Sequence, residues 1–219
     1  MKKLITLVAL IALCVSNIQA EREAWQKRIY LKAGVNFANM VSKYKNGDSD
    51  KKDRKDVRAG YNLTVGHQKQ VGKLGGYWGQ ELSLSTRGWK DGEGATERKA
   101  LAHSIQLSPI TFGWRAQLLD ILEIDPHAGV YGSLDFLTDI DNDANPDESN
   151  WRDYRDNIGA DHFRPFDLGM NLGIGFWIDE WLNIDFNFQR GFVTVFKYDD
   201  DDDHKFLSSN FMIRLGIAL

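Results

Sequence analysis

Short segments of the chain alternate strictly between apolar and small polar residues. In residues 166–176, FDLGMNLGIGF, every even position is apolar and every odd position is Asp, Asn or Gly. A period of two places all the apolar side chains on one face of a β-strand. The pattern predicts a strand with one apolar face, and the alternation alone leaves open whether that face meets a protein core or a membrane.

Eight segments of this kind follow one another along the chain. The predicted strands cover residues 30–41, 57–68, 77–89, 101–114, 122–136, 166–176, 182–188 and 210–219. In the fourth segment the apolar positions change from odd to even numbers after Pro109, as a β-bulge near Ser108 and Pro109 would produce. The succession predicts an all-β fold, an eight-stranded antiparallel up-and-down barrel.

The connections between the predicted strands alternate in length. Those after strands two, four and six contain KQVGKLGG, AQLLD and DEW, whereas those after strands one, three, five and seven are longer and charged. Short periplasmic turns and long extracellular loops are typical of outer-membrane barrels.

A soluble barrel of the lipocalin kind would show the same alternation with its apolar face inside. The residue sizes favour a transmembrane barrel instead. Phe, Leu and Ile crowd one face of the strands, and only the smaller Gly, Ser and Asn of the other face fit inside eight strands. This polar face also carries charges of both signs, which can pair in a narrow lumen. They are Lys32, Arg58, Arg87 and Arg214 with Glu81, Glu123, Asp125, Asp167 and Asp185.

Aromatic residues near the strand ends give a further indication of a membrane barrel. We predict two aromatic girdles of the kind that bilayers favour. The first, at the short turns, comprises Tyr30, Trp78, Trp114, Trp177 and Trp181, and the second, at the long loops, comprises Tyr44, Trp89, Phe196 and Tyr198.

The first 20 residues have the layout of a bacterial secretory signal. Lys2 and Lys3 precede an apolar run over residues 4–15, and Ala20 provides a small residue for cleavage. The apolar run is too short for a transmembrane helix. We therefore predict a signal peptide at 1–20, a periplasmic N-terminal segment at 21–29 and an outer-membrane β-barrel domain at 30–219.

Cleavage would remove Cys14, the only cysteine, together with two lysines and no acidic residue. The formal net charge would then change from -4 to -4 - 2 = -6. This acidic balance argues against nucleic acid as a partner.

The segments resemble the PorT-like, "porin family" outer-membrane β-barrel domain of Bacteroidota over nearly the whole mature chain. The motifs that carry the resemblance are LKAGVNFAN, QELSLSTRGWK, SIQLSPITF, PHAGVYGS, FDLGMNLGIGF and RLGIAL. The resemblance implies a location in the cell outer membrane and contact with the barrel-insertion machinery during biogenesis. Asn187 stands where such proteins often have an interior Arg, and Leu219 replaces the aromatic residue that often ends them.

No motif predicts an enzyme, and we expect no catalytic, cofactor-binding or metal-binding residues and no cofactor. His127 is expected in the lumen beside Asp125. His103 and Ser104 are adjacent on one strand and so point to opposite faces, which prevents them from forming a nucleophile and base pair. The remaining histidines are expected at strand ends or in loops, in contact with water; they are His67, His162 and His204.

Two acidic loops are candidate cation sites. The stretch DIDNDANPDESN resembles a calcium loop only in its first residues, Asp139, Asp141 and Asp143, because Ala144 and Asn150 replace the required Gly and Glu. Residues 198–204, YDDDDDH, could hold a divalent cation weakly, although a run of like charges is usually only solvated.

These observations predict a monomeric outer-membrane barrel with a closed, side-chain-filled polar lumen, because open aqueous channels need about 16 to 18 strands. The expected role is structural or surface-interacting, through the extracellular loops. The expected surroundings are outer-membrane lipid and lipopolysaccharide, with a surface ligand of unknown identity. The alternatives are a narrow channel for small solutes or ions and, less favoured, a lipid-modifying outer-membrane enzyme.

Overall fold

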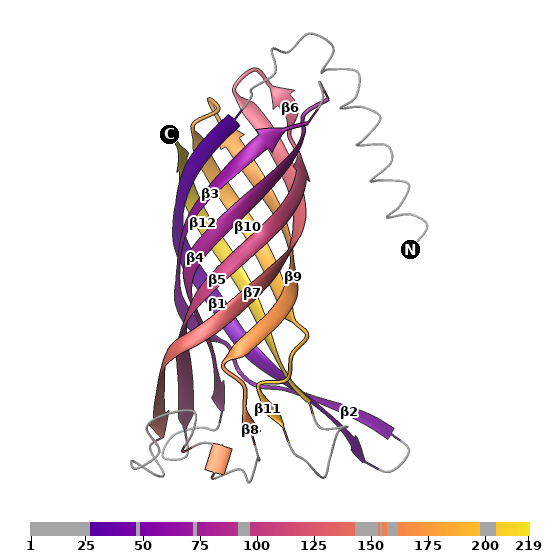
Figure 1. Ribbon diagram of the computed structural model, residues 1–219, viewed down its shortest axis with the longest axis vertical. Coiled ribbons are helices and arrows are strands. Elements are labelled where there is room, and N and C mark those ends of the chain that lie inside the picture. Colours follow the sequence, from indigo (N-terminus) through magenta and orange to yellow (C-terminus); the bar gives the residue numbers. More distant parts are fainter. Residues whose placement is uncertain are drawn as a thin grey trace.

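Eight long strands wind into a closed antiparallel barrel in the computed structural model (Figure 1). The structure describes residues 27–46, 49–71, 74–91, 97–142, 153, 155–156, 162–197 and 205–219. The long strands are β1 (Lys27–Asn46), β3 (Arg58–Gln70), β4 (Gly76–Asp91), β5 (Arg98–Trp114), β7 (Leu122–Asn142), β9 (Phe166–Ile178), β10 (Leu182–Gly191) and β12 (Lys205–Ala218). Each pairs with the next, and β12 pairs with β1 to close the barrel. All eight predicted strands are confirmed, and the first begins three residues earlier than predicted.

Four short strands lie in the connections. They are β2 (Ser49–Arg54), β6 (Ala116–Leu119), β8 (His162–Phe163) and β11 (Phe196–Lys197). In Figure 1, β6 lies at the end of the barrel that carries the C-terminus, which we call the turn end, and β2, β8 and β11 lie at the opposite loop end. The predicted long connections are confirmed after β1, β7 and β10, whereas the connection between β4 and β5, residues 92–97, is no longer than the turn-end connection of residues 115–121. The predicted signal peptide lies outside the described residues, among which no helix is long and apolar enough to cross a membrane.

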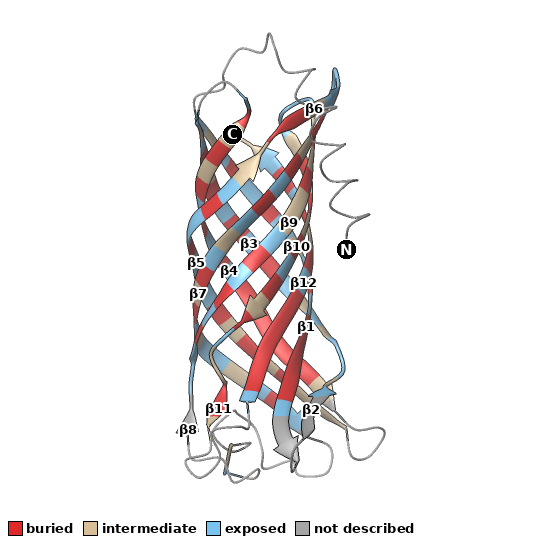
Figure 2. Cartoon of the chain, turned by 90° about the vertical axis from the view of Figure 1, so that its right-hand side faces the viewer, coloured by how far each residue is buried: buried red, intermediate tan, exposed pale blue. Residues whose placement is uncertain are grey.

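The apolar face of the strands points outward. In β9, Leu168, Met170 and Leu172 are 48%, 51% and 62% exposed, whereas Asp167 and Asn171 are 0% and 4% exposed. Figure 2 shows the resulting alternation of exposed and buried positions along the strands around the barrel. The barrel therefore has a polar interior and an apolar coat, as the residue sizes predicted.

The predicted bulge at Pro109 is confirmed. Leu107 pairs with Gly132 and Ile110 pairs with Val130, so two residues of β5 oppose one of β7. The extra residue keeps both Leu107 and Ile110 on the exposed face.

A second bulge, which the alternation did not predict, places Phe136 between two paired positions. His103 pairs with Leu137 and Ser104 pairs with Asp135, so Phe136 is the extra residue. Phe136 and Leu137 are consequently both exposed.

The predicted aromatic girdles are largely wrong. Tyr30, Trp177, Trp89 and Phe196 are buried, because they occupy inward-facing positions or, for Phe196, a segment packed inside the barrel. Trp181 is 53% exposed, and Trp78 and Trp114 are half-buried. The prediction used the position of each residue along its strand and ignored the face of the strand on which its side chain lies. The side chains of Tyr44 and Tyr198 lie outside the described residues.

Thr86 is buried, although its alternation with Leu82 and Leu84 along residues 77–89 predicts a side chain on the apolar outer face. Pairing between β3 and β4 ends at Asn62 and Ser85. Thr86 fills the gap beyond that point: its hydroxyl donates to Asn36 Oδ1 at 2.9 Å and accepts from the backbone N–H of Tyr61 at 3.0 Å.

Three inward tyrosines each lie over a glycine of the neighbouring strand. The pairs, read from the strand register, are Tyr30 with Gly66, Tyr77 with Gly113 and Tyr131 with Gly169. A Cβ atom at any of these glycines would lie within 2.7 Å of the facing ring. The missing side chain is therefore what lets each ring lie flat against the wall.

We expect Gly66→Ala to lower the free energy of unfolding by about 1–3 kcal/mol, because the new methyl group overlaps the ring of Tyr30. Urea unfolding of protein refolded into lipid vesicles measures the change. Gly76→Ala is the matched control, since its nearest atom is Val71 O at 3.6 Å, and should change stability by less than about 0.5 kcal/mol. Equal losses for the two variants would contradict the packing argument.

Candidate functional site in the barrel lumen

Near the turn end, Arg115 occupies the lumen among acidic and aromatic groups. Its guanidinium carbon lies 3.8 Å from the ring centroid of Trp177. Arg115 Nη1 is 3.6 Å from Glu123 Oε2, and Arg115 Nε is 3.8 Å from Asp125 Oδ2. Tyr77 and Trp177 each donate a hydrogen bond to Asp125, at 2.6 and 3.0 Å. Arg115 was missed by the sequence analysis because it directly precedes a segment that was interpreted as a short turn.

A second cluster of charges joins four strands across the lumen. Arg214 donates from Nε to Asp185 at 2.8 Å and from Nη1 to Glu81 at 3.3 Å. Lys32 Nζ lies 3.1 Å from Asp185 Oδ2 and 3.5 Å from Glu81 Oε1. Tyr30 donates a 2.8 Å hydrogen bond to Glu81. Each of the two carboxylates therefore faces two cations, which offsets the cost of burying it.

His127 lies beside this cluster, in the lumen as predicted. Its Nδ1 atom is 3.0 Å from the carbonyl oxygen of Asp125, and its Nε2 atom is 3.5 Å from Asp185 Oδ2. Asn187, at the position where the resemblance expected an interior Arg, places Nδ2 3.2 Å from His127 Nε2. Arg214 thus provides the interior arginine that pairs with Asp185, and Asn187 contributes an uncharged contact to His127.

A third cluster lies toward the loop end. Arg87 donates to Asp135 from Nε at 3.0 Å and from Nη2 at 2.5 Å, and to Asp167 from Nη1 at 2.8 Å. Three hydroxyl groups donate to the same carboxylates; they belong to Ser104, Tyr131 and Ser208. Every carboxylate of this cluster is thus held by a cation and by at least one neutral donor.

Apolar side chains replace the charges at the loop end of the interior. The buried cluster comprises Met40, Trp89, Ala100, Ala102, Ile140, Val195, Phe196 and Phe206. Most come from five barrel strands, and Val195 and Phe196 come from the connection between β10 and β12. Hydrogen bonds from Val195 N to Phe206 O and from Arg164 N to Val195 O, both 2.9 Å, hold this connection in place.

The predicted interior charges are confirmed. Eight of the nine are buried, and Arg58 is half-buried. The small positions of β9 also face inward: Gly173 lies against His127, Gly175 against Asp125 and Gly169 against the ring of Tyr131.

The other candidate residues lie apart from one another in the described part of the chain. Ser104 points into the lumen, whereas the His103 ring contacts the outward-facing Tyr61 hydroxyl at 3.0 Å, so their predicted separation is confirmed. His67 packs edge-on against Trp78. Asp139 and Asp141 are exposed, and no described group of three or more His, Cys, Asp or Glu could hold a metal. Residues 143–150 and 198–204, the His162 side chain and His204 lie outside the described residues.

A family model described as "Outer membrane protein beta-barrel domain" matches residues 19–197. The chain belongs to this family. The protein is accordingly an outer-membrane β-barrel, and its apolar outer face contacts lipid. No match to the chain was found among curated protein sequences.

Several solved outer-membrane barrels are similar to this chain. Neisserial surface protein A is 12% identical, with 86% of this chain and 96% of that chain covered and a TM-score of 0.45. OprG from Pseudomonas aeruginosa is 11% identical, with coverages of 89% and 96% and a TM-score of 0.44. The outer membrane enzyme PagL is 11% identical, with coverages of 83% and 98% and a TM-score of 0.36.

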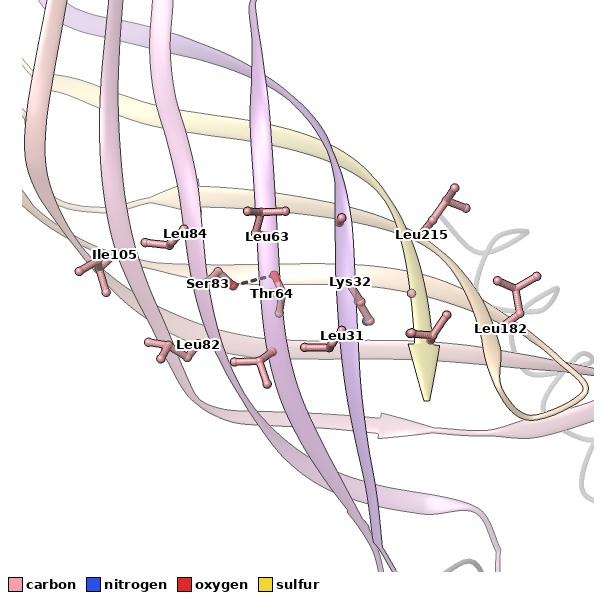
Figure 3. Close-up of a pocket in the computed structure, with 14 residues that line it drawn as sticks. Leu31, Lys32, Leu63, Thr64, Leu82, Ser83, Leu84, Ile105, Leu182 and Leu215 are labelled. Carbon is pink, nitrogen blue, oxygen red and sulfur yellow. Dashed lines mark hydrogen bonds between the residues drawn. The ribbon is translucent and has the colours of Figure 1, made fainter. Parts of the chain in front are cut away.

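The lipid-facing surface of this outer-membrane barrel contains a shallow apolar hollow of about 720 Å³, drawn in Figure 3. Leucines of several strands line it, including Leu31, Leu63 and Leu82, each 44–50% exposed. Thr64 and Ser83, which alternate with these leucines, are buried and join by a 2.8 Å hydrogen bond. The hollow is thus part of the lipid-facing coat, and the polar chemistry lies on the other side of the wall.

We expect Arg214→Met to lower the free energy of unfolding by about 3–5 kcal/mol, because Asp185 and Glu81 would keep only Lys32 as a close lysine or arginine partner. Urea unfolding in lipid vesicles measures the change. Lys99→Met is the control: Lys99 pairs with Glu97 at 2.7 Å at the surface, and its loss should cost no more than about 1 kcal/mol. A loss for Arg214→Met as small as that of the control would show that the central cluster does not stabilise the barrel.

Proposed function

We propose that this protein is a monomeric outer-membrane barrel of the PorT-like type with a closed lumen, which acts as a structural or surface-interaction protein through its extracellular loops. Its partners on this proposal are outer-membrane lipid and lipopolysaccharide, the insertion machinery during biogenesis, and a surface ligand. The PorT-like assignment rests on the sequence motifs quoted above.

The observation that carries the proposal is the filling of the lumen at successive levels. Arg214 of β12 reaches Glu81 of β4, and Arg87 of β4 reaches Asp167 of β9, so ion pairs cross the lumen between strands that are not neighbours in the sheet. Eight strands enclose only enough space for side chains. The apolar cluster around Trp89 adds a further barrier at the loop end.

The length of the strands supports a role for the loops. β1 has 20 residues and β7 has 21, about twice the 9–11 residues that a strand needs to span a bilayer. The barrel wall therefore continues beyond the membrane toward the loop end. The apolar cluster inside this extension supports the extracellular loops by filling the interior of the barrel beneath them.

We expect the purified protein to show no steady conductance in planar lipid bilayers, because ion pairs and the apolar cluster occupy the lumen. A general porin in the same bilayers serves as the positive control. The unboiled protein should also migrate faster on a gel than the boiled protein, as a closed barrel does. Steady unitary currents from single barrels would overturn the closed-lumen proposal.

A narrow water-sized channel is the second candidate, because several buried polar atoms in the lumen have no hydrogen-bond partner among the described residues. They include Asn62 Nδ2, Ser133 Oγ, Asn171 Oδ1 and Gln189 Oε1. Buried water commonly satisfies such groups. Stopped-flow light scattering of vesicles tests this candidate: water permeability above that of empty vesicles would favour a channel for water.

A lipid-modifying enzyme is less favoured. Ser104 donates to Asp135 inside the barrel, away from His103 and from the lipid. We expect mass spectra of lipid A from cells with and without the gene to be identical. A gene-dependent loss or gain of an acyl chain would instead establish an enzymatic activity.

A further inference from the structure

Three phenylalanines mark one level on the outer surface of adjacent strands. Phe188 of β10 pairs with Phe211 of β12, and Phe211 pairs with Phe37 of β1. All three are 37–43% exposed. They form a continuous aromatic row on the face that contacts lipid.

The next outward positions toward the loop end are polar on all three strands. Arg190 of β10 pairs with Ser209 of β12, and Ser209 pairs with Asn39 of β1. Arg54, at the end of β2, adds a second guanidinium close to this row. Between two successive outward positions these three strands therefore change from aromatic to polar residues, the kind of change found at the edge of the hydrocarbon region of a membrane barrel.

A hollow of about 390 Å³ joins the two rows. It is lined by Phe37, Phe188, Phe211 and Val57 on its apolar side and by Asn39, Ser209 and Arg54 on its polar side. The hollow thus has an apolar part beside a polar part, the arrangement that an amphipathic lipid requires.

The polar part of the hollow lacks partners for its groups within the described chain. Among the described residues, no carboxylate lies within salt-bridge distance of Arg54, which lines the hollow, or of Arg190, which lies next to the hollow through its pairing with Ser209. The nearby Asp53 instead lies 3.6 Å from Lys55. Asn39 is 9% exposed, and its Oδ1 atom has no hydrogen-bond partner among the described residues.

These groups match the chemistry of a phosphorylated sugar lipid. Two guanidinium groups without acidic partners among the described residues favour a phosphate, which arginine can bind through paired hydrogen bonds. The free acceptor Asn39 Oδ1 needs a donor, which a sugar hydroxyl or amide provides and a bare phosphate dianion lacks. The phenylalanine row lies where the acyl chains of that lipid would begin.

We propose that Arg54, Arg190, Asn39 and Ser209 form a binding site for the phosphorylated glycolipid of the outer leaflet, lipid A. The site holds a lipid A phosphate between the two arginines and the acyl chains against Phe37, Phe188 and Phe211. This inference rests on the proposed function in that the loop end must face the cell exterior.

Native mass spectrometry of the detergent-solubilised full protein, with bisphosphorylated lipid A as the probe, tests the site. The double variant Arg54→Gln/Arg190→Gln should bind lipid A about tenfold more weakly or worse, because it loses two charge-assisted contacts. The matched control is Lys27→Gln/Lys69→Gln, an exposed, register-paired couple of cations at the turn end. It should change affinity by no more than about twofold.

Two further probes identify the ligand chemistry. Lipid A without phosphates should bind the unaltered protein about as weakly as the intact lipid binds the double variant. Neither phosphatidylglycerol nor inorganic phosphate at equal concentration should displace lipid A. Equal affinities of the double variant and the turn-end control, or displacement by either competitor, would overturn the proposal.

The fold of each variant is checked by its migration on a gel before boiling. If the double variant does not fold, Arg54→Gln alone, at the end of the short strand β2, gives the same comparison with a smaller expected loss. Lipid binding is measured independently of conductance. A closed barrel that does not bind lipid A would contradict this site alone, whereas a conducting barrel that binds lipid A would contradict only the proposed closed lumen.

Discussion

An eight-stranded barrel encloses only enough space for side chains to fill, so an inward-facing charge needs an opposite charge beside it. This constraint explains why Arg214 and Arg87 each contact two carboxylates from other strands. The resulting ion pairs cross the interior and connect strands that are not neighbours in the sheet. The filling of the lumen and the stability of the barrel therefore depend on the same side chains.

The polarity of the wall reverses along the barrel axis. Between the turn end and the row formed by Asn39, Ser209 and Arg190, apolar side chains face outward and charges face inward. Beyond that row, Trp89 and Phe196 are inside, as in a water-soluble protein. The reversal follows from the surrounding medium, since the outer face meets lipid in one part and water in the other.

Three tyrosines inside the barrel both pack against the wall and donate hydrogen bonds to buried carboxylates. Tyr30, Tyr77 and Tyr131 each cover a glycine of the next strand and donate a hydrogen bond to a buried carboxylate, at 2.6–3.2 Å. Each tyrosine thereby links the packing of the wall to the charge clusters. Each tyrosine therefore links a glycine position to an acidic residue, which lies on the strand of that glycine or on another strand. No pattern within a single strand shows this link.

Local pattern determined much of this protein. A period of two fixes the face of each side chain, so the eight strands, the apolar coat, the interior charges and the bulge at Pro109 could all be predicted from the sequence. The tertiary structure decided the rest. The second bulge at Phe136, the inward positions of Trp89 and Trp177, the contacts of Arg115 and the polar row beside Arg54 depend on register between strands distant in the chain. Alternation carries no information about that register, because it describes one strand at a time.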